Sequence, residues 1–127
     1  MTEEHPKVLI ITVGLPRSGK STWAQKQQHP IVCADAVRQA LYGRLWEDLS
    51  EDFVWANVFL MIRALFLAGN DTVIVDTTNV THYRRAKLKW NPKWEEKVPR
   101  WIRTYQVFDT PKEVCIQRAK DTNQEYL

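Results

Sequence analysis

The chain has 127 residues, which is the size of one domain of roughly 100 to 200 residues, so one core and one site are expected and a second catalytic domain is excluded. Hydrophobic residues make up 44% and charged residues 26% of the sequence, which is typical of soluble globular proteins and excludes wholesale disorder. The net charge of +3 favours an anionic partner, and it fits ATP alone as well as a nucleic acid.

The two cysteines, Cys33 and Cys115, indicate no zinc site and no disulfide framework, because they lie far apart and have no CxxC spacing. We expect two small buried thiols in a reducing cytosol. No stretch approaches the ~20 apolar residues of a membrane span, and the first ten residues are too polar for a signal peptide. A cytoplasmic protein without a membrane partner is therefore predicted.

The first predicted strand covers residues 8–13, a short β-branched run typical of a strand buried on both faces of a parallel sheet. It ends at Gly14. A helix over residues 20–28 follows, and His29-Pro30 stops it. Residues 31–33 are the second predicted strand.

A second helix is expected to begin at Asp35, as its cap, and to end at Gly43. Residues 51–68 have apolar side chains at helical spacing with a wide buried stripe, and this helix stops at Gly69-Asn70. Residues 72–75 then form a third buried strand that ends in Asp76.

Residues 81–90 predict a helix broken by Asn91-Pro92, residues 101–108 predict a strand, and a final helix begins at Pro111. No internal repeat, low-complexity run or linker interrupts the pattern. The sequence therefore predicts a single α/β domain over residues 1–127, with a mostly parallel sheet flanked by helices.

Residues 14–21 match the pattern G-x-x-x-x-G-K-[ST] in full, directly after a strand and directly before a helix. In that setting backbone N–H groups converge on a phosphate, Lys20 adds a positive charge near the β- and γ-phosphates, and Ser21 ligates Mg²⁺. The alternative is a glycine turn with an exposed lysine. The motif does not separate kinases from ATPases or GTPases. The predicted nucleotide-binding residues are Gly14, Leu15, Pro16, Arg17, Ser18, Gly19, Lys20, Ser21 and Thr22.

Asp35 is the candidate general base, since phosphoryl transfer to a hydroxyl needs a carboxylate near the γ-phosphate. It follows the second strand, at the sheet edge that Gly14 also occupies. Arg38 lies one helical turn further on, so both side chains can face one cleft. The alternative is a helix cap with a solvated arginine.

Asp76 ends the third strand at the same edge and precedes a polar segment. A carboxylate there can hold a magnesium-bound water or orient Lys20. The alternative is a capping aspartate before a turn.

Basic residues crowd the region from residue 84 to residue 103 and alternate with tryptophans. Such a surface could hold an acceptor's phosphates and stack its bases. The alternative is a solvated face whose aromatic rings turn toward the core. The residues are Arg84, Arg85, Lys87, Lys89, Lys93, Lys97, Arg100 and Arg103, with Trp90, Trp94 and Trp101 between them.

These residues resemble the kinase domain of phage-type polynucleotide 5′-hydroxyl kinases and their small P-loop kinase relatives. The resemblance covers nearly the whole chain. It rests on G-L-P-R-S-G-K-S-T-W-A at 14–24, on Asp35 with Arg38, on D-T-T-N at 76–79 before Arg84-Arg85, and on V-F-D at 107–109. It is more specific than a bare phosphate loop, although relatives with other acceptors share much of it.

The resemblance implies an adenylate-kinase-like sheet that binds ATP and magnesium, with Asp35 as general base, Arg38 on the acceptor's phosphate and Asp76 as a structural or metal-organising carboxylate. It also implies a lid near residues 110–125 with two arginines one helical turn apart. Arg118 matches the first, and Thr122 stands in place of the second. Relatives usually continue with a further helix, so a natural minimal form and a truncated chain are both open.

The leading hypothesis is therefore an ATP-dependent kinase that phosphorylates the 5′-hydroxyl at an end of single-stranded DNA or RNA. A small-metabolite or nucleoside kinase would keep every phosphate-binding residue and differ only in its acceptor pocket. A third reading is a non-catalytic ATP-binding module, which Thr122 favours and Asp35 disfavours.

Overall fold

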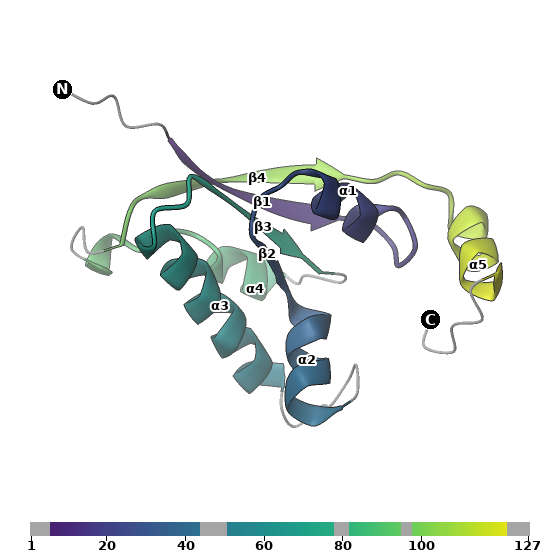
Figure 1. The fold of residues 1–127 in the computed structure, drawn as a ribbon, viewed down its shortest axis with the longest axis horizontal. Coiled ribbons are helices and arrows are strands. Elements are labelled where there is room, and N and C mark those ends of the chain that lie inside the picture. Colours follow the sequence, from purple (N-terminus) through teal and green to yellow (C-terminus); the bar gives the residue numbers. More distant parts are fainter. Residues whose placement is uncertain (1–5, 44–50, 78–81, 95–97, 122–127) are drawn as a thin grey trace.

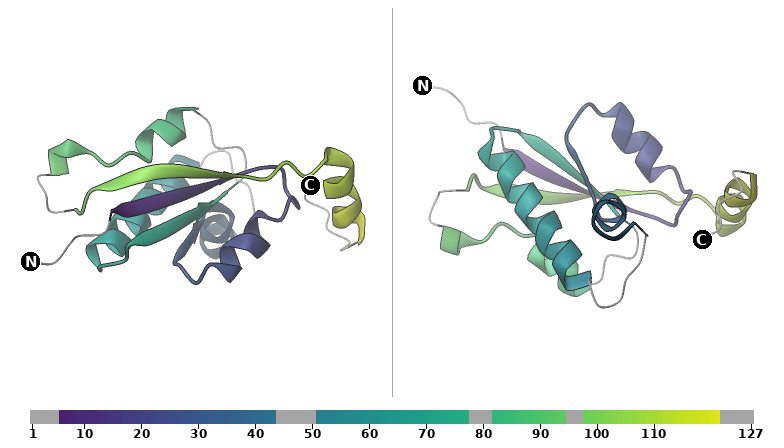
Figure 2. Two further views of the ribbon diagram at one scale, coloured as in Figure 1. Left: turned by 90° about the horizontal axis from the view of Figure 1, so that it is seen from above. Right: turned by 60° about the horizontal axis from the view of Figure 1, so that its bottom comes forward.

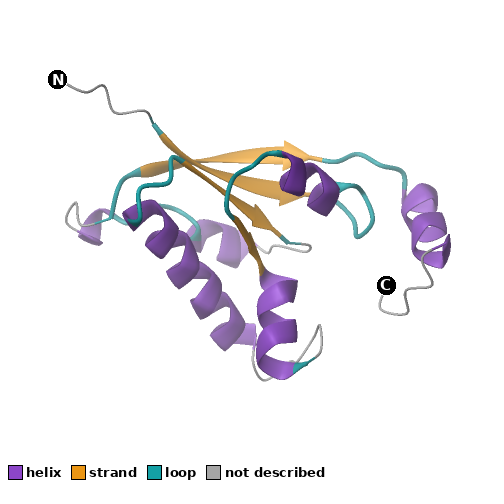
Figure 3. Cartoon of the chain, in the orientation of Figure 1, coloured by secondary structure: helices purple, strands orange, loops and turns teal. Residues whose placement is uncertain are grey.

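A four-stranded parallel sheet forms the centre of the molecule (Figures 1 and 3). The computed structural model describes residues 6–43, 51–77, 82–94 and 98–121, and of residues 82–84 and 94 only the backbone. The strand order is β2-β3-β1-β4. The strands are β1 (Lys7–Val13), β2 (Ile31–Cys33), β3 (Thr72–Asp76) and β4 (Trp101–Val107), each within one residue of its predicted bounds.

Helices lie on both faces of this sheet. Figure 2 shows α1 (Lys20–Lys26) and α3 (Glu51–Leu67) on opposite sides of the strands. In Figure 1, α2 (Ala34–Tyr42) and α4 (His82–Lys87) lie on the same side as α3, while α5 (Lys112–Asp121) lies beyond the end of β4. Right-handed connections between parallel strands give this distribution, because the chain reverses direction across the sheet after β2. A short 3₁₀ turn, η2 (Pro92–Trp94), precedes β4.

Three helices depart from the predicted bounds. The first ends at Lys26, since Gln28 adopts a left-handed conformation (φ 60°) just ahead of Pro30. The helix predicted over residues 81–90 is shorter and ends at Lys87. The predicted cap of α2 is wrong: strand β2 runs straight into the helix, the extended residue Cys33 is its N-cap, and Asp35 lies inside the first turn.

The core lies between the sheet and α3. Val54, Val58, Ile62 and Phe66, spaced four residues apart, are at most 1% exposed and form the stripe that packs on the strands. Their partners include Leu9, Ile11, Val73 and Val75, the alternate residues of β1 and β3. Among the described residues, no helix has both the length and the apolar character needed to cross a membrane.

The parallel strands end together at one edge of the sheet. Cys33 at the end of β2 pairs with Asp76 at the end of β3, and β1 ends one residue before Gly14. The segments that follow these three strands therefore meet at one edge, as expected of an open parallel sheet. This edge holds the phosphate loop, Asp35 and Asp76.

Candidate active site

Residues 14–19 form a tight loop between β1 and α1. A Cβ on Gly14 would lie 2.7 Å from Ser18 Oγ and 3.0 Å from Phe108 Cβ, so no side chain fits there. Phe108 donates its backbone N–H to Val13 O at 2.8 Å and packs edge-on against Trp23 of α1. The end of β4 therefore supports the loop from the side, and Phe108 was not among the predicted site residues.

Lys20 is the first residue of α1, and its side chain reaches back to this loop. The residue is 5% exposed. Its ammonium group donates to the carbonyl oxygens of Gly14 and Leu15, at 3.0 and 2.7 Å. Burial lowers the pKa of Lys20, and the negative charges of Asp76 and Asp35 act in the opposite direction. Because β2 and β3 end together at Cys33 and Asp76, Lys20, Asp35 and Asp76 lie at the same sheet edge and form one charged cluster there.

Two polar side-chain atoms of the loop are buried without a hydrogen-bond partner, Ser18 Oγ and Arg17 Nη2. Buried polar atoms are normally satisfied, so these two are available to hydrogen-bond a molecule bound at the loop. With the tight turn at Gly14 and the ammonium group of Lys20, they supply hydrogen-bonding groups that suit the phosphate oxygens of ATP. The other predicted nucleotide contacts, Leu15, Pro16 and Thr22, are exposed.

Ser21 and Asp76, the two predicted metal residues, contact each other. The Ser21 hydroxyl donates to Asp76 Oδ2 at 2.7 Å, and the Thr12 hydroxyl donates to Asp76 Oδ1 at 3.2 Å. A hydroxyl beside a carboxylate next to a phosphate site is the hard oxygen chemistry that Mg²⁺ prefers. The residues present therefore fit a magnesium ion that Ser21 would ligate, with Asp76 accepting the hydrogen bond of the Ser21 hydroxyl. Thr12 was missed, although a hydroxyl in a buried strand two residues before Gly14 was a usable signal.

Asp35 and Arg38 also contact each other, as their spacing predicts. Arg38 Nη1 donates to Asp35 Oδ1 at 2.5 Å, while its Nε and Nη2 donate to the two carboxylate oxygens of Glu51, each at 2.6 Å. Hydrogen bonding to Glu51 raises the pKa of Arg38. The Arg38 side chain is 8% exposed, so it is not the solvated arginine of the alternative interpretation. Sequence reasoning missed Glu51.

The last turn of α5 and the segment that precedes this helix both contact the phosphate loop. Arg118 Nη1 donates to Arg17 O at 2.9 Å, and the Thr110 hydroxyl donates to Ser18 O at 2.8 Å. Arg118 therefore reaches the loop, in the region predicted as the lid. Thr122, the departure from the two-arginine pattern, lies outside the described residues.

The described tryptophans of the basic region turn inward. Trp101 is 6% exposed, stacks on Phe66 with ring centroids 4.8 Å apart, and donates its indole N–H to Leu88 O at 2.9 Å. Trp90 donates to Val98 O at 2.8 Å, and the Arg100 guanidinium lies 5.2 Å from its ring centroid. These contacts support the interpretation of a solvated basic face over inward-facing rings. The side chains of Arg84, Trp94 and Lys97 lie outside the described residues.

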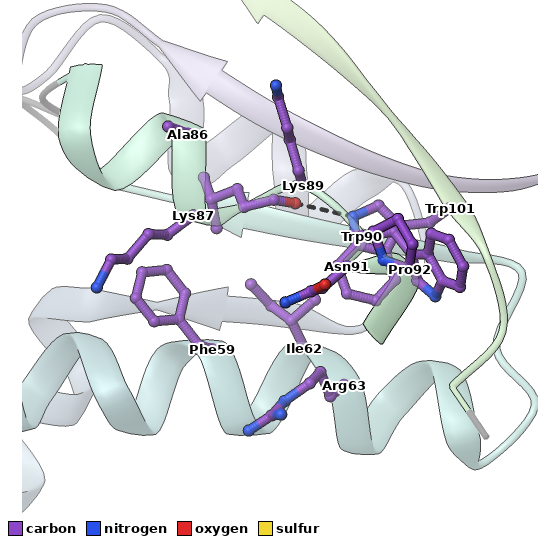
Figure 4. A pocket seen from close by; sticks show the side chains of 11 residues that line it. Phe59, Ile62, Arg63, Ala86, Lys87, Lys89, Trp90, Asn91, Pro92 and Trp101 are labelled. Carbon is purple, nitrogen blue, oxygen red and sulfur yellow. Dashed lines mark hydrogen bonds between the residues drawn. The ribbon is translucent and has the colours of Figure 1, made fainter. Parts of the chain in front are cut away.

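A cavity of about 530 Å³ lies in this region between α3 and residues 86–92 (Figure 4). Phe59, Ile62 and Arg63 rise from α3 on one side, and Trp90 and Trp101 line the other. Trp101 begins β4, whereas the phosphate loop follows the carboxyl end of β1. The cavity is therefore separate from the cluster around Lys20.

The strand order, the parallel sheet and the phosphate loop define a P-loop protein with the kinase fold. The family model described as an AAA domain matches residues 9–125. The chain belongs to this family, AAA_33, and its predicted resemblance to P-loop kinases is confirmed. No curated protein matches the chain significantly.

Solved structures share this fold. The Pnkp1/Rnl/Hen1 complex contains a chain that is 27% identical, with a TM-score of 0.71 over 98% of this chain, which spans 43% of that chain's length. A putative kinase from Chloroflexus aurantiacus j-10-fl is 14% identical with a TM-score of 0.69, and 94% and 67% of the two chains are covered. A sugar kinase from Janibacter sp. HTCC2649 is 19% identical with a TM-score of 0.60, over 96% and 69%. The latter two show the fold alone.

Proposed function

We propose that this chain is an ATP-dependent kinase that transfers the γ-phosphate to a hydroxyl, with Asp35 as general base. The observation that carries the proposal is the position of Asp35, a half-exposed carboxylate two residues after Cys33, which pairs with Asp76 at the sheet edge that also holds the phosphate loop. A module that only binds ATP has no need of a base beside the γ-phosphate.

In the proposed reaction the acceptor hydroxyl oxygen attacks the γ-phosphorus in line with the bond to the β–γ bridging oxygen. That bond breaks, ADP leaves, and the hydroxyl proton passes to Asp35 Oδ2. Lys20 and the loop N–H groups bind the phosphate oxygens, and Arg118 lies beside the loop to bind charge that develops on the transferred group. Magnesium held by Ser21 and backed by Asp76 would supply further neutralisation of the β- and γ-phosphates.

We further propose that the acceptor is the 5′-hydroxyl of DNA or RNA. The support for this choice over a small metabolite is the likeness to the Pnkp1/Rnl/Hen1 complex, one chain of which is 27% identical to this chain, together with the resemblance to polynucleotide kinases. The net charge of +3 is compatible with either acceptor. The likeness to the sugar kinase extends to the fold only.

The test is transfer of labelled γ-phosphate to a 5′-hydroxyl oligonucleotide, run beside nucleosides, sugars and other small hydroxyl compounds. Label on the oligonucleotide, lost in Lys20→Ala, supports the full proposal. Label on a small acceptor keeps the mechanism and replaces the acceptor. Binding of ATP without transfer to any acceptor would contradict the proposal and favour a regulatory module.

A further inference from the structure

Glu51 and Asp35 bind the same guanidinium group from two helices. Glu51 is the first residue of α3, and its two oxygens accept from Nε and Nη2 of Arg38, each at 2.6 Å. Asp35 takes only Nη1, through Oδ1. Three N–H groups of one arginine thus hold two carboxylates, and the trio carries a formal charge of −1.

Burial differs sharply between the two carboxylates. The side chain of Glu51 is 11% exposed and that of Asp35 is 45% exposed. A buried carboxylate is tolerated when it is paired and hydrogen-bonded, and the first turn of a helix adds a favourable dipole. Glu51 is therefore an internal partner of Arg38, while Asp35 faces the open side.

The position of Glu51 is fixed by the core. Val54 and Val58, one and two turns further along α3, are fully buried against the sheet. A carboxylate on the first turn of such a helix has little freedom to move. Glu51 can therefore fix the orientation of the Arg38 guanidinium plane through its two hydrogen bonds.

The orientation of the guanidinium decides which Asp35 oxygen is left without a hydrogen bond from Arg38. An arginine and a single carboxylate favour a forked pair that occupies both carboxylate oxygens. Glu51 takes the fork here, and among the described residues no group donates a hydrogen bond to Asp35 Oδ2. A base needs one such oxygen to accept a proton.

We infer that Glu51 is a positioning residue, which keeps the Arg38 fork away from Asp35 and so leaves Asp35 Oδ2 available to the acceptor hydroxyl. This inference rests on the proposed kinase function. Without Glu51, the guanidinium can turn its fork toward Asp35 and block the base.

The test compares Glu51→Gln with Glu113→Gln, which removes an exposed carboxylate from the equivalent first turn of α5. We expect kcat for transfer to fall about 100-fold in Glu51→Gln, with ATP affinity unchanged, because misplacing a catalytic group by about 1 Å costs that much. Glu113→Gln should keep wild-type kcat. In an Arg38→Ala background, Glu51→Gln should add little, since both changes act through one group.

A merely structural Glu51 would lower the unfolding temperature and leave kcat of the folded enzyme unchanged, which would overturn the inference. So would a Glu51→Gln loss that is undiminished in the Arg38→Ala background. The NMR resonance of Arg38 Nε–H gives a readout without any acceptor. It should move in Glu51→Gln and stay in Glu113→Gln. An unmoved resonance overturns the inference even if the proposed function holds, whereas a moved resonance without transfer by the wild type contradicts the proposed function alone.

Discussion

Ser21 in the first turn of α1 donates a hydrogen bond of 2.7 Å to Asp76 at the end of β3. Thr12 of β1 binds the other oxygen of the same carboxylate. Asp76 is 5% exposed, so its orientation is set by these two hydroxyls from neighbouring parts of the site. Groups that hydrogen-bond to a metal ligand in this way orient the ligand and tune the affinity of the site for the metal.

Asp76→Asn should therefore weaken the response to magnesium. The substitution keeps the shape of the side chain and removes its charge behind Ser21. We expect the magnesium concentration for half-maximal transfer to rise about 10- to 100-fold, measured by titrating the ion at saturating ATP. Asp71→Asn, which removes an exposed carboxylate just before the same strand, is the control and should respond as the wild type does. An unchanged titration in Asp76→Asn would contradict the assignment.

Gly14→Ala should weaken ATP binding by about tenfold. The new Cβ would overlap Ser18 Oγ and press on Phe108, so the loop must widen. Overpacking of this kind costs about 1 to 3 kcal/mol, part of which appears as lost affinity. Gly69→Ala is a matched control: Gly69 has φ 104° with open space around it, so the variant loses stability but keeps ATP affinity. Wild-type ATP affinity in Gly14→Ala, measured by calorimetry, would show that the close packing around Gly14 does not control ATP binding.

ATP affinity should fall as pH rises toward the lowered pKa of Lys20. Burial depresses that pKa, so the free protein loses the Lys20 proton at a lower pH than an ordinary lysine does. Bound phosphates favour the charged form, and binding in this window takes up a proton. In the same window the unfolded chain holds more protons than the folded one, so the stability of the free protein rises with pH.

Calorimetry of ATP binding in buffers of different ionisation enthalpy measures this proton uptake directly. The pH dependence should vanish in Lys20→Met and persist in Lys26→Met, which removes an exposed lysine from the end of the same helix. A pH-dependent affinity of equal size in Lys20→Met would assign the effect to another group.

Phe66→Ala should destabilise the fold by about 3 to 5 kcal/mol. Phe66 is fully buried and stacks on Trp101. This contact packs α3 against β4. Phe53 lies on the same helix and is 56% exposed, so Phe53→Ala should change the free energy of unfolding by less than about 0.5 kcal/mol. Urea denaturation of both variants checks the pair. Equal losses would mean that α3 does not pack through the Phe66 face.

The strands and the phosphate loop could be predicted from the sequence because their signals are local. All the signals lie within residues 8–21: the run of β-branched residues, then Gly14 and Gly19, then Lys20-Ser21. The structure keeps these parts next to one another. Asp35 and Arg38 are one helical turn apart, so their contact also follows from spacing alone.

The contact between Arg38 and Glu51 could not be predicted in that way. The two residues are 13 positions apart and belong to different helices, so only the packing of α2 beside α3 brings them together. The cap predicted at Asp35 failed for a related reason. Aspartate is a common cap, but β2 continues into α2 without a loop and gives that place to Cys33.

The central claim is that Asp35 makes this ATP site catalytic. The most direct measurement is transfer of labelled γ-phosphate to a 5′-hydroxyl oligonucleotide by the wild type and by Asp35→Asn, with ATP affinity measured on the same samples. The account predicts transfer by the wild type, a loss of about 10² to 10⁴ in Asp35→Asn, and equal ATP affinity. Transfer by Asp35→Asn at the wild-type rate would contradict it.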